Sequence, residues 1–113
     1  MLVMLNSLLK QYIEEIGKIY GEHLKSVILY GSYARGDFRP ESDIDIMILL
    51  DLSDVEICKY RKQLSWITYD FNEEHDIDIK PIAKSEAHYK KWLNAYPFYA
   101  NVKQEGVELY GTA

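Results

Sequence analysis

The sequence has few of the features that mark secreted or membrane proteins. Its 113 residues include one cysteine, Cys58, so no disulfide can form within the chain and a reducing compartment is indicated. The first ten residues are apolar, but Asn6, Ser7 and Lys10 interrupt them, and they lack the basic region and cleavage site of a signal peptide. No apolar run reaches transmembrane length. We therefore expect a cytoplasmic protein with no membrane partner.

Linkers, repeats and low-complexity segments are also missing, and basic residues are in the minority. A chain of this length has room for one hydrophobic core, so we expect residues 1–113 to form a single domain. Thirteen basic residues against eighteen acidic ones give a net charge of −5. Binding to a long nucleic-acid duplex normally needs a basic patch, and none is evident here. A long duplex is therefore not an expected ligand.

Aromatic residues are abundant instead. There are fifteen, ten of them tyrosine, and they crowd toward the end of the chain. Two interpretations stay open, because tyrosine and tryptophan suit partly wet protein interfaces but can equally complete a small core. The residues in question are Tyr89, Trp92, Tyr96, Phe98, Tyr99 and Tyr110.

Hydrophobic periodicity predicts helices and strands in alternation through the first half of the chain. Apolar residues at steps of three and four predict a helix over residues 2–23. A β-rich run over 26–30 predicts a strand, and a brief helix or turn is expected over 32–36. The run 43–50 predicts a second strand, whose continuously apolar end is typical of a central strand covered on both faces.

The second half continues the alternation. A capping box at Ser53 opens a predicted helix over 54–72, with Cys58 expected in the core. A third strand is predicted over 76–82, with Pro81 near its end. We expect one or two helices over 85–106, broken near Pro97, and a short closing strand over 107–110. This order predicts one α/β or α+β domain, without fixing strand order or direction.

The most informative run is Gly31-Ser32, ten further residues, and then Asp43-Ile44-Asp45. Side chains alternate along a strand, so the two carboxylates share one face while Ile44 faces the core. Such paired oxygen ligands, together with substrate phosphates, are typical of Mg²⁺ sites in phosphoryl transfer. Gly31 lacks a Cβ that would obstruct a phosphate, and Ser32 offers a hydroxyl and a backbone N–H.

With this spacing, the run resembles the signature of the DNA polymerase β-type nucleotidyltransferases in their minimal form, the MNT group. The resemblance is densest over residues 24–50. It implies a palm-like domain with a mixed sheet flanked by helices. It also implies that Gly31 and Ser32 hold the nucleotide's terminal phosphates and that Asp43 and Asp45 bind metal.

The family pattern has a third carboxylate on a later strand, acting as general base or metal ligand. Asp76 and Asp78 both qualify here, and we choose Asp78 because isoleucines flank it on both sides. Arg35 lies within the phosphate turn and either contacts phosphate or is an ordinary surface charge. Lys80 alternates with Asp78 and therefore shares its face.

The resemblance also implies a chemistry. Two Mg²⁺ ions, or Mn²⁺, would be held by Asp43, Asp45 and Asp78, and the enzyme would move AMP from ATP to a hydroxyl. MNT proteins are often the antitoxins of HEPN-domain ribonucleases, so the expected acceptor is a tyrosine of a HEPN-type toxin. A single small domain leaves no room for an acceptor site of its own, so we expect a hetero-oligomer or a homodimer.

Two alternatives remain open from the sequence. One is an antitoxin that neutralises its partner only by forming a complex, through a surface made of the aromatic residues near the C-terminus. The other is a transferase of a small molecule, similar to the aminoglycoside nucleotidyltransferases, although no acidic second domain is evident to bind a polycation. A hydrolase with a Ser-His-Asp triad is not indicated, because the chain has no nucleophile elbow.

Overall fold

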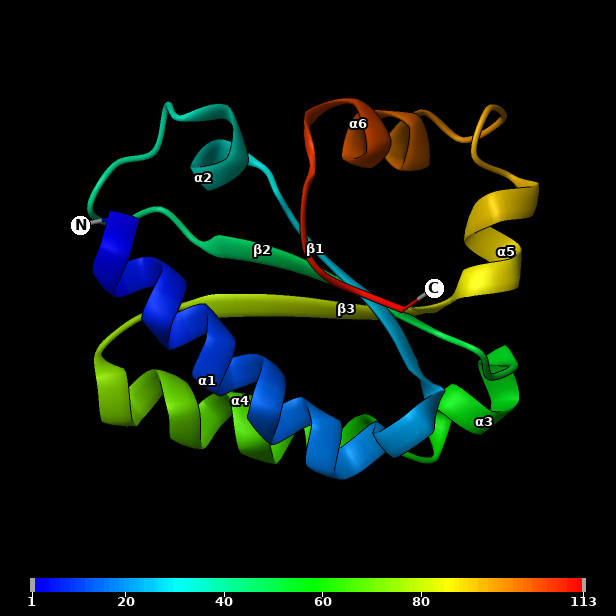
Figure 1. Ribbon diagram of the computed structural model, residues 1–113, viewed down its shortest axis with the longest axis horizontal. Helices are drawn as coiled ribbons and strands as arrows, with labels where there is room; N and C mark the ends of the chain where they lie inside the picture. The colour runs from blue at the N-terminus through cyan, green and yellow to red at the C-terminus, as the bar shows by residue number, and fades with distance from the viewer. Residues whose placement is uncertain (1, 113) are drawn as a thin grey trace.

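A four-stranded sheet separates two layers of helices in the computed structural model, which describes residues 2–112 (Figure 1). In chain order the elements are α1 (Leu2–Tyr20), the 3-10 turn η1 (Gly21–His23), β1 (Leu24–Tyr30), α2 (Ser32–Arg35), β2 (Ile44–Leu50), α3 (Asp54–Cys58), α4 (Arg61–His75), β3 (Ile79–Ser85), α5 (Glu86–Lys91), α6 (Pro97–Glu105) and β4 (Val107–Gly111). In this part of the chain no helix is both long and apolar enough to cross a membrane.

The sheet is mixed, with strand order β3-β2-β1-β4. β1 is antiparallel to β2 and to β4, whereas β2 and β3 are parallel. β2 is therefore paired on both edges, and all but one of its residues are buried. The expected mixed sheet flanked by helices is confirmed, as is a central strand covered on both faces.

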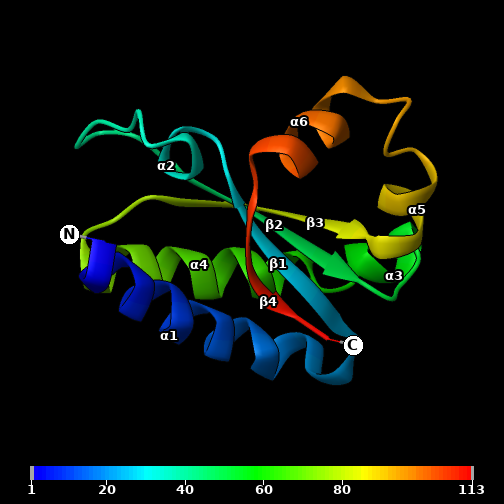
Figure 2. The same ribbon diagram turned by 45° about the horizontal axis from the view of Figure 1, so that its top comes forward.

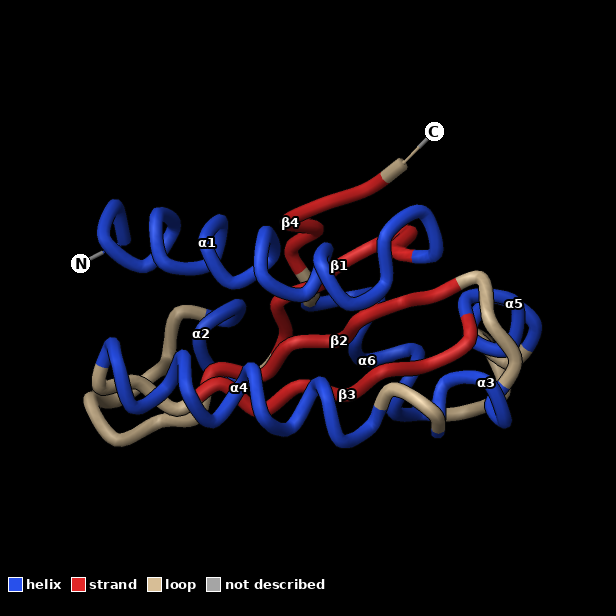
Figure 3. The backbone as a smooth tube through the Cα atoms, turned by 90° about the horizontal axis from the view of Figure 1, so that it is seen from below, coloured by secondary structure: helices blue, strands red, loops and turns tan. Residues whose placement is uncertain are grey.

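One face of the sheet packs against α1 and α4, which lie side by side beneath it (Figure 3). Ile44, Ile46 and Ile48 of β2 point into this layer. Tyr12 of α1 stands at its centre, fully buried, where its ring meets Phe71 edge-on at 5.4 Å. This layer forms the larger core of the domain.

The opposite face packs against α5 and α6, which lie across the sheet from α1 and α4 (Figure 2). Met47 and Leu49 of β2 are buried there among Tyr89, Tyr99 and Val102. For two of the aromatic residues near the C-terminus the core interpretation is confirmed, and the interface interpretation stays a prediction for the exposed ones. Two tyrosines complete this smaller core, and the exposed ones are Tyr96, Phe98 and Tyr110.

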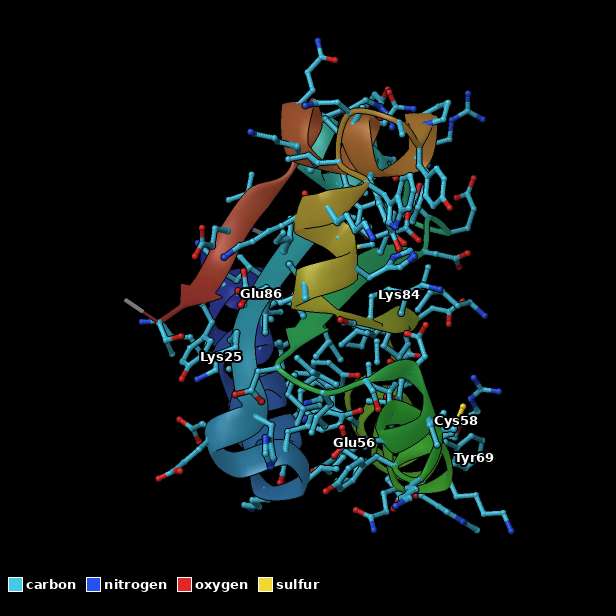
Figure 4. All side chains as sticks on the ribbon, turned by 90° about the vertical axis from the view of Figure 1, so that its right-hand side faces the viewer. Lys25, Glu56, Cys58, Tyr69, Lys84 and Glu86 are labelled. Atoms are coloured by element: carbon cyan, nitrogen blue, oxygen red, sulfur yellow. The ribbon has the colours of Figure 1, made fainter. Side chains whose placement is uncertain are left out.

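The predicted helix over 54–72 is two helices. The capping box is confirmed, with the Ser53 hydroxyl accepting a hydrogen bond from the N–H of Glu56 at 3.2 Å. The first helix ends at Cys58, and a turn through Tyr60 starts α4, which continues to His75. Because this turn faces Cys58 outward, the residue is exposed, and its expected place in the core was wrong (Figure 4).

The third strand begins three residues later than predicted. Asp76 closes α4 in a left-handed conformation, with φ 52° and ψ 51°, so the backbone cannot be extended there. The Asn72 side chain then donates to the Ile79 carbonyl and accepts from the Ile79 N–H, which fixes the start of β3. Pro81 lies inside this strand rather than at its end, which an edge strand tolerates because one side needs no N–H.

The buried hydroxyls of Tyr12 and Thr68 share a hydrogen bond of 2.7 Å that ties α1 to α4. Burial raises the pKa of Tyr12 well above its usual range, so this phenol stays protonated. Tyr12→Phe leaves the Thr68 hydroxyl without its partner, and we expect the free energy of unfolding to fall by about 1–3 kcal/mol. Urea unfolding checks this. The double variant Tyr12→Phe/Thr68→Val should lie closer to wild type than the two single losses added together.

Candidate active site

The turn after β1 depends on a conformation that glycine alone adopts readily. Gly31 has φ 77° and ψ −155°, a region almost closed to other residues. A Cβ built on Gly31 would overlap the Oδ2 atom of Asp45. The Asp45 carboxylate therefore lies directly against the Gly31 backbone. The predicted turn and the predicted metal ligand Asp45 thus meet in space.

The short helix α2 follows at once and carries the cation of the site. Its single turn is closed by the N–H of Arg35 donating to the Gly31 carbonyl at 3.0 Å. Gly36 ends it in the left-handed conformation, with φ 86°. The Arg35 guanidinium and the Gly31 N–H contact one carboxylate, and a contact of Arg35 with phosphate stays a prediction.

Glu105, the last residue of α6, closes the other side of the turn. Its Oε1 atom accepts the N–H of Gly31 at 3.2 Å. Arg35 Nη1 donates to both carboxylate oxygens, at 3.3 and 3.4 Å. Sequence reasoning missed this residue, because 74 positions separate it from Gly31 and no local motif marks it.

Asp43 and Asp45 lie on the α6 side of the sheet, as strand alternation predicts. Ile44 and Ile46 are buried in the opposite core. Asp45, opposite Tyr30 on β1, is partly buried, and Asp43 is exposed just before β2 begins. Burial is the main cause that raises the pKa of Asp45, with Asp43 and Glu105 adding to it and Arg35 opposing it.

Tyr30 belongs to the same cluster. Burial first, and the nearby Asp45 carboxylate second, raise the pKa of Tyr30 to about 12. Its ring meets Phe98 of α6 edge-on at 5.6 Å. Tyr30 is therefore an uncharged side chain that lies between the Asp45 carboxylate and Phe98 of α6.

Asp78 lies next to Asp43, although it precedes β3 rather than belonging to it. The Asp78 carbonyl accepts the Ile44 N–H at 2.8 Å, which brings the two chain segments together. A side-chain hydrogen bond with Asp78 is the main cause that raises the pKa of Asp43. Lys80 Nζ lies 3.7 Å from Asp78 Oδ1 and shares its face. Asp76, by contrast, is the residue that closes α4.

The donor set suits a hard divalent ion completed by other oxygen ligands. Within residues 2–112 no group of three or more His, Cys, Asp or Glu side chains is arranged to hold a metal ion by itself. Mg²⁺ needs no such group, because one or two carboxylates with substrate phosphates and water commonly hold it. The hydrogen bond and charge of Asp78 raise the pKa of Asp43, and burial followed by the charge of Asp43 raises the pKa of Asp45, so a bound cation would relieve the repulsion among these carboxylates.

Comparison with known proteins shows what this arrangement belongs to. Residues 9–99 match the family of nucleotidyltransferase domains. The chain belongs to the nucleotidyltransferase family. The predicted resemblance is confirmed, and the enzyme class with it.

Two proteins of Methanocaldococcus jannaschii named as candidate protein adenylyltransferases are similar over nearly their whole length. One is 36% identical over 103 residues, covering 90% of this chain and 94% of the relative. The other is 34% identical over 102 residues, covering 90% and 95%.

Solved structures share the fold. A Sulfolobus solfataricus protein described as a candidate nucleotidyltransferase superposes with a TM-score of 0.60 at 22% identity, covering 96% of this chain and 82% of that one. A chain of a Shewanella oneidensis complex, a tri-AMPylated HEPN toxin with an MNT antitoxin, gives 0.53 at 19% identity, covering 95% and 73%. A toxin–antitoxin structure with AMP-PNP gives 0.57 at 21%, covering 90% and 73%.

Gly31→Ala tests the close approach at the turn. The new methyl group would overlap Asp45, and alanine in this backbone region costs about 1–3 kcal/mol. We expect a lower free energy of unfolding and at least tenfold weaker ATP binding, measured by urea unfolding and titration calorimetry. The matched control is Gly17→Ala within α1, where a Cβ meets nothing within 4 Å. This control should stabilise the fold by about 0.5–1 kcal/mol and leave ATP binding unchanged.

Proposed function

We propose that this nucleotidyltransferase moves AMP from ATP to a tyrosine hydroxyl of a HEPN-type toxin and thereby acts as its antitoxin. The observation that carries the proposal is a cluster in which Asp45 lies against Gly31 and Asp43 lies near both Asp45 and Asp78. The name of the Methanocaldococcus relatives as candidate protein adenylyltransferases supports AMP transfer to protein. The tri-AMPylated HEPN toxin in the Shewanella complex supports the acceptor class.

Asp43, Asp45 and Asp78 are the residues that would hold divalent metal, Mg²⁺ or Mn²⁺, together with the triphosphate. Bound there, the metal would neutralise charge on the phosphates and lower the pKa of the acceptor hydroxyl. Carboxylates are the hard oxygen ligands that such ions prefer. Lys80, 3.7 Å from Asp78, offsets part of the acidic charge in the free protein.

The other residues of the site bind and orient the nucleotide. The Gly31 N–H, the Ser32 hydroxyl and the Arg35 guanidinium offer donors to phosphate oxygens. The acceptor oxygen would attack the α-phosphorus of ATP. The bond between the α-phosphorus and the oxygen that bridges it to the β-phosphorus would break, and pyrophosphate would leave. Asp78, exposed beside Asp43, would take the hydroxyl proton.

The acceptor would come from another chain. Asp43 and Asp78 are both exposed, and within residues 2–112 no further lobe covers them. Carboxylates this exposed suit a macromolecular acceptor that supplies its own tyrosine. Exposed Phe98 on α6, whose ring contacts Tyr30, and exposed Tyr96 just before that helix offer apolar surface near the site for such a partner. A hetero-oligomer fits this arrangement better than a homodimer.

A transfer assay tests the proposal. The protein would be incubated with α-labelled ATP, MgCl₂ and a purified HEPN-domain toxin, and the products read by gel and intact mass. We expect an AMP-sized mass on the toxin, lost in Asp43→Asn and Asp45→Asn but kept in the charge-matched control Asp70→Asn on the exposed side of α4. The labelled site should disappear when the toxin's tyrosines are replaced by phenylalanine.

The same assay separates the binding-only alternative. A toxin that stays unlabelled, yet is inhibited equally by the wild type and by Asp43→Asn/Asp45→Asn, would show neutralisation by complex formation alone. Label transferred only to small hydroxyl compounds would point instead to a small-molecule transferase. Folding of each variant would be checked by circular dichroism, because both aspartates flank buried strand residues.

A further inference from the structure

The Glu105 carboxylate stands where the proposed phosphate ligand needs to be. The Gly31 N–H donates to it at 3.2 Å, and Arg35 Nη1 donates to both of its oxygens. Backbone N–H groups of a glycine turn and an arginine fork are donors that proteins commonly offer to phosphate. A carboxylate and a phosphate cannot share the same donors without strong repulsion.

We propose that Glu105 is an internal competitor for the triphosphate, which occupies its donors in the free protein and yields them when the nucleotide binds. This inference rests on the proposed nucleotide site at Gly31 and Arg35. Glu105 would thereby set ligand specificity, because a ligand must carry enough negative charge to displace a carboxylate. A triphosphate meets this requirement better than a nucleoside monophosphate. With the nucleoside bound in the same position, the single phosphate of a monophosphate would not reach the Gly31 turn.

The exchange needs only a side-chain rotation. The backbone of α6 is held where Gly106 N–H donates to the Val102 carbonyl at 2.8 Å, and Val102 is buried. The Glu105 side chain itself is 26% exposed and that of Arg35 is 46% exposed. Ion pairs this accessible to water are weak and break readily. The carboxylate can therefore swing into solvent while the helix stays in place.

Arg35 does not depend on Glu105 for its position. Its Nε atom also donates to Asp37 Oδ2 at 3.2 Å, within the same turn. If Glu105 served only to orient Arg35, its removal would weaken nucleotide binding. If it competes with phosphate, its removal strengthens binding, because Arg35 keeps its second anchor. The two roles predict opposite signs.

Titration calorimetry with ATP and MgCl₂ on Glu105→Gln tests the proposal. We expect the Kd for ATP to fall about three- to fivefold, in keeping with the loss of one surface ion pair. The Kd for AMP should change less than twofold. The matched control is Glu22→Gln, which removes the same charge from an exposed position in η1, before β1 begins and at the opposite end of that strand from Gly31. Its Kd for ATP should equal that of the wild type.

A double-variant cycle with Arg35→Ala tests the route of the effect. Arg35→Ala alone should weaken ATP binding, and in that background the gain from Glu105→Gln should shrink. An unchanged or higher Kd for ATP in Glu105→Gln, with a wild-type melting temperature, would overturn the competitor role. So would a wild type and a variant that both fail to bind ATP.

The binding experiment is independent of the transfer assay. ATP binding that tightens in Glu105→Gln, without AMP appearing on the toxin, would reject the proposed function and keep the competitor role. If the wild type transfers AMP but its Glu105→Gln variant binds ATP no more tightly, the proposed function would be kept and the competitor role rejected.

Discussion

The antiparallel pairing of β1 with β2 is the constraint on which the site depends. It sets Tyr30 opposite Asp45 and thereby brings the Asp45 carboxylate against Gly31, where a Cβ has no room. β2 can hold this position because it is hydrogen-bonded on both edges and buried on both faces. A one-residue slip in register would turn Asp43 and Asp45 into the apolar core under α1 and α4. The burial of Ile44 and Ile46 thus fixes the face on which the neighbouring carboxylates lie.

The charges of the site are balanced locally, although the chain as a whole is acidic. Arg35 faces Glu105 and Asp37, and Lys80 faces Asp78. Asp43 and Asp45 have no such partner within 4 Å among the described residues, and the pKa of each is raised. The cations that are present therefore leave these two carboxylates unpaired at the start of the central strand β2. The divalent metal proposed for this site would supply the missing positive charge.

Much of this arrangement could be predicted from local sequence. The alternation along 43–50 predicted that the two carboxylates share one face, because strand geometry has a fixed period. The resemblance to the nucleotidyltransferases implied that they form one site with the Gly31 turn. The start of β3 could not be predicted this way. It depends on the left-handed backbone of Asp76 and on the side-chain amide of Asn72, and the hydrophobic periodicity of the sequence reveals neither feature. Glu105 lay beyond reach for another reason: its role exists only after β4 has folded back beside β1.

The end of α6 determines how much of β2 is open to ligands. Residues Asp43, Asp45, Met47 and Leu49 alternate along one face, yet only the last two are covered by α5 and α6. The helix stops at Gly106, where a Cβ would overlap the Val102 carbonyl oxygen and approach Ile28, and the chain turns there to pair β4 with β1. A shorter α6 would leave the Gly31 turn without Glu105. The return of β4 therefore fixes both the open carboxylates and the competitor beside them.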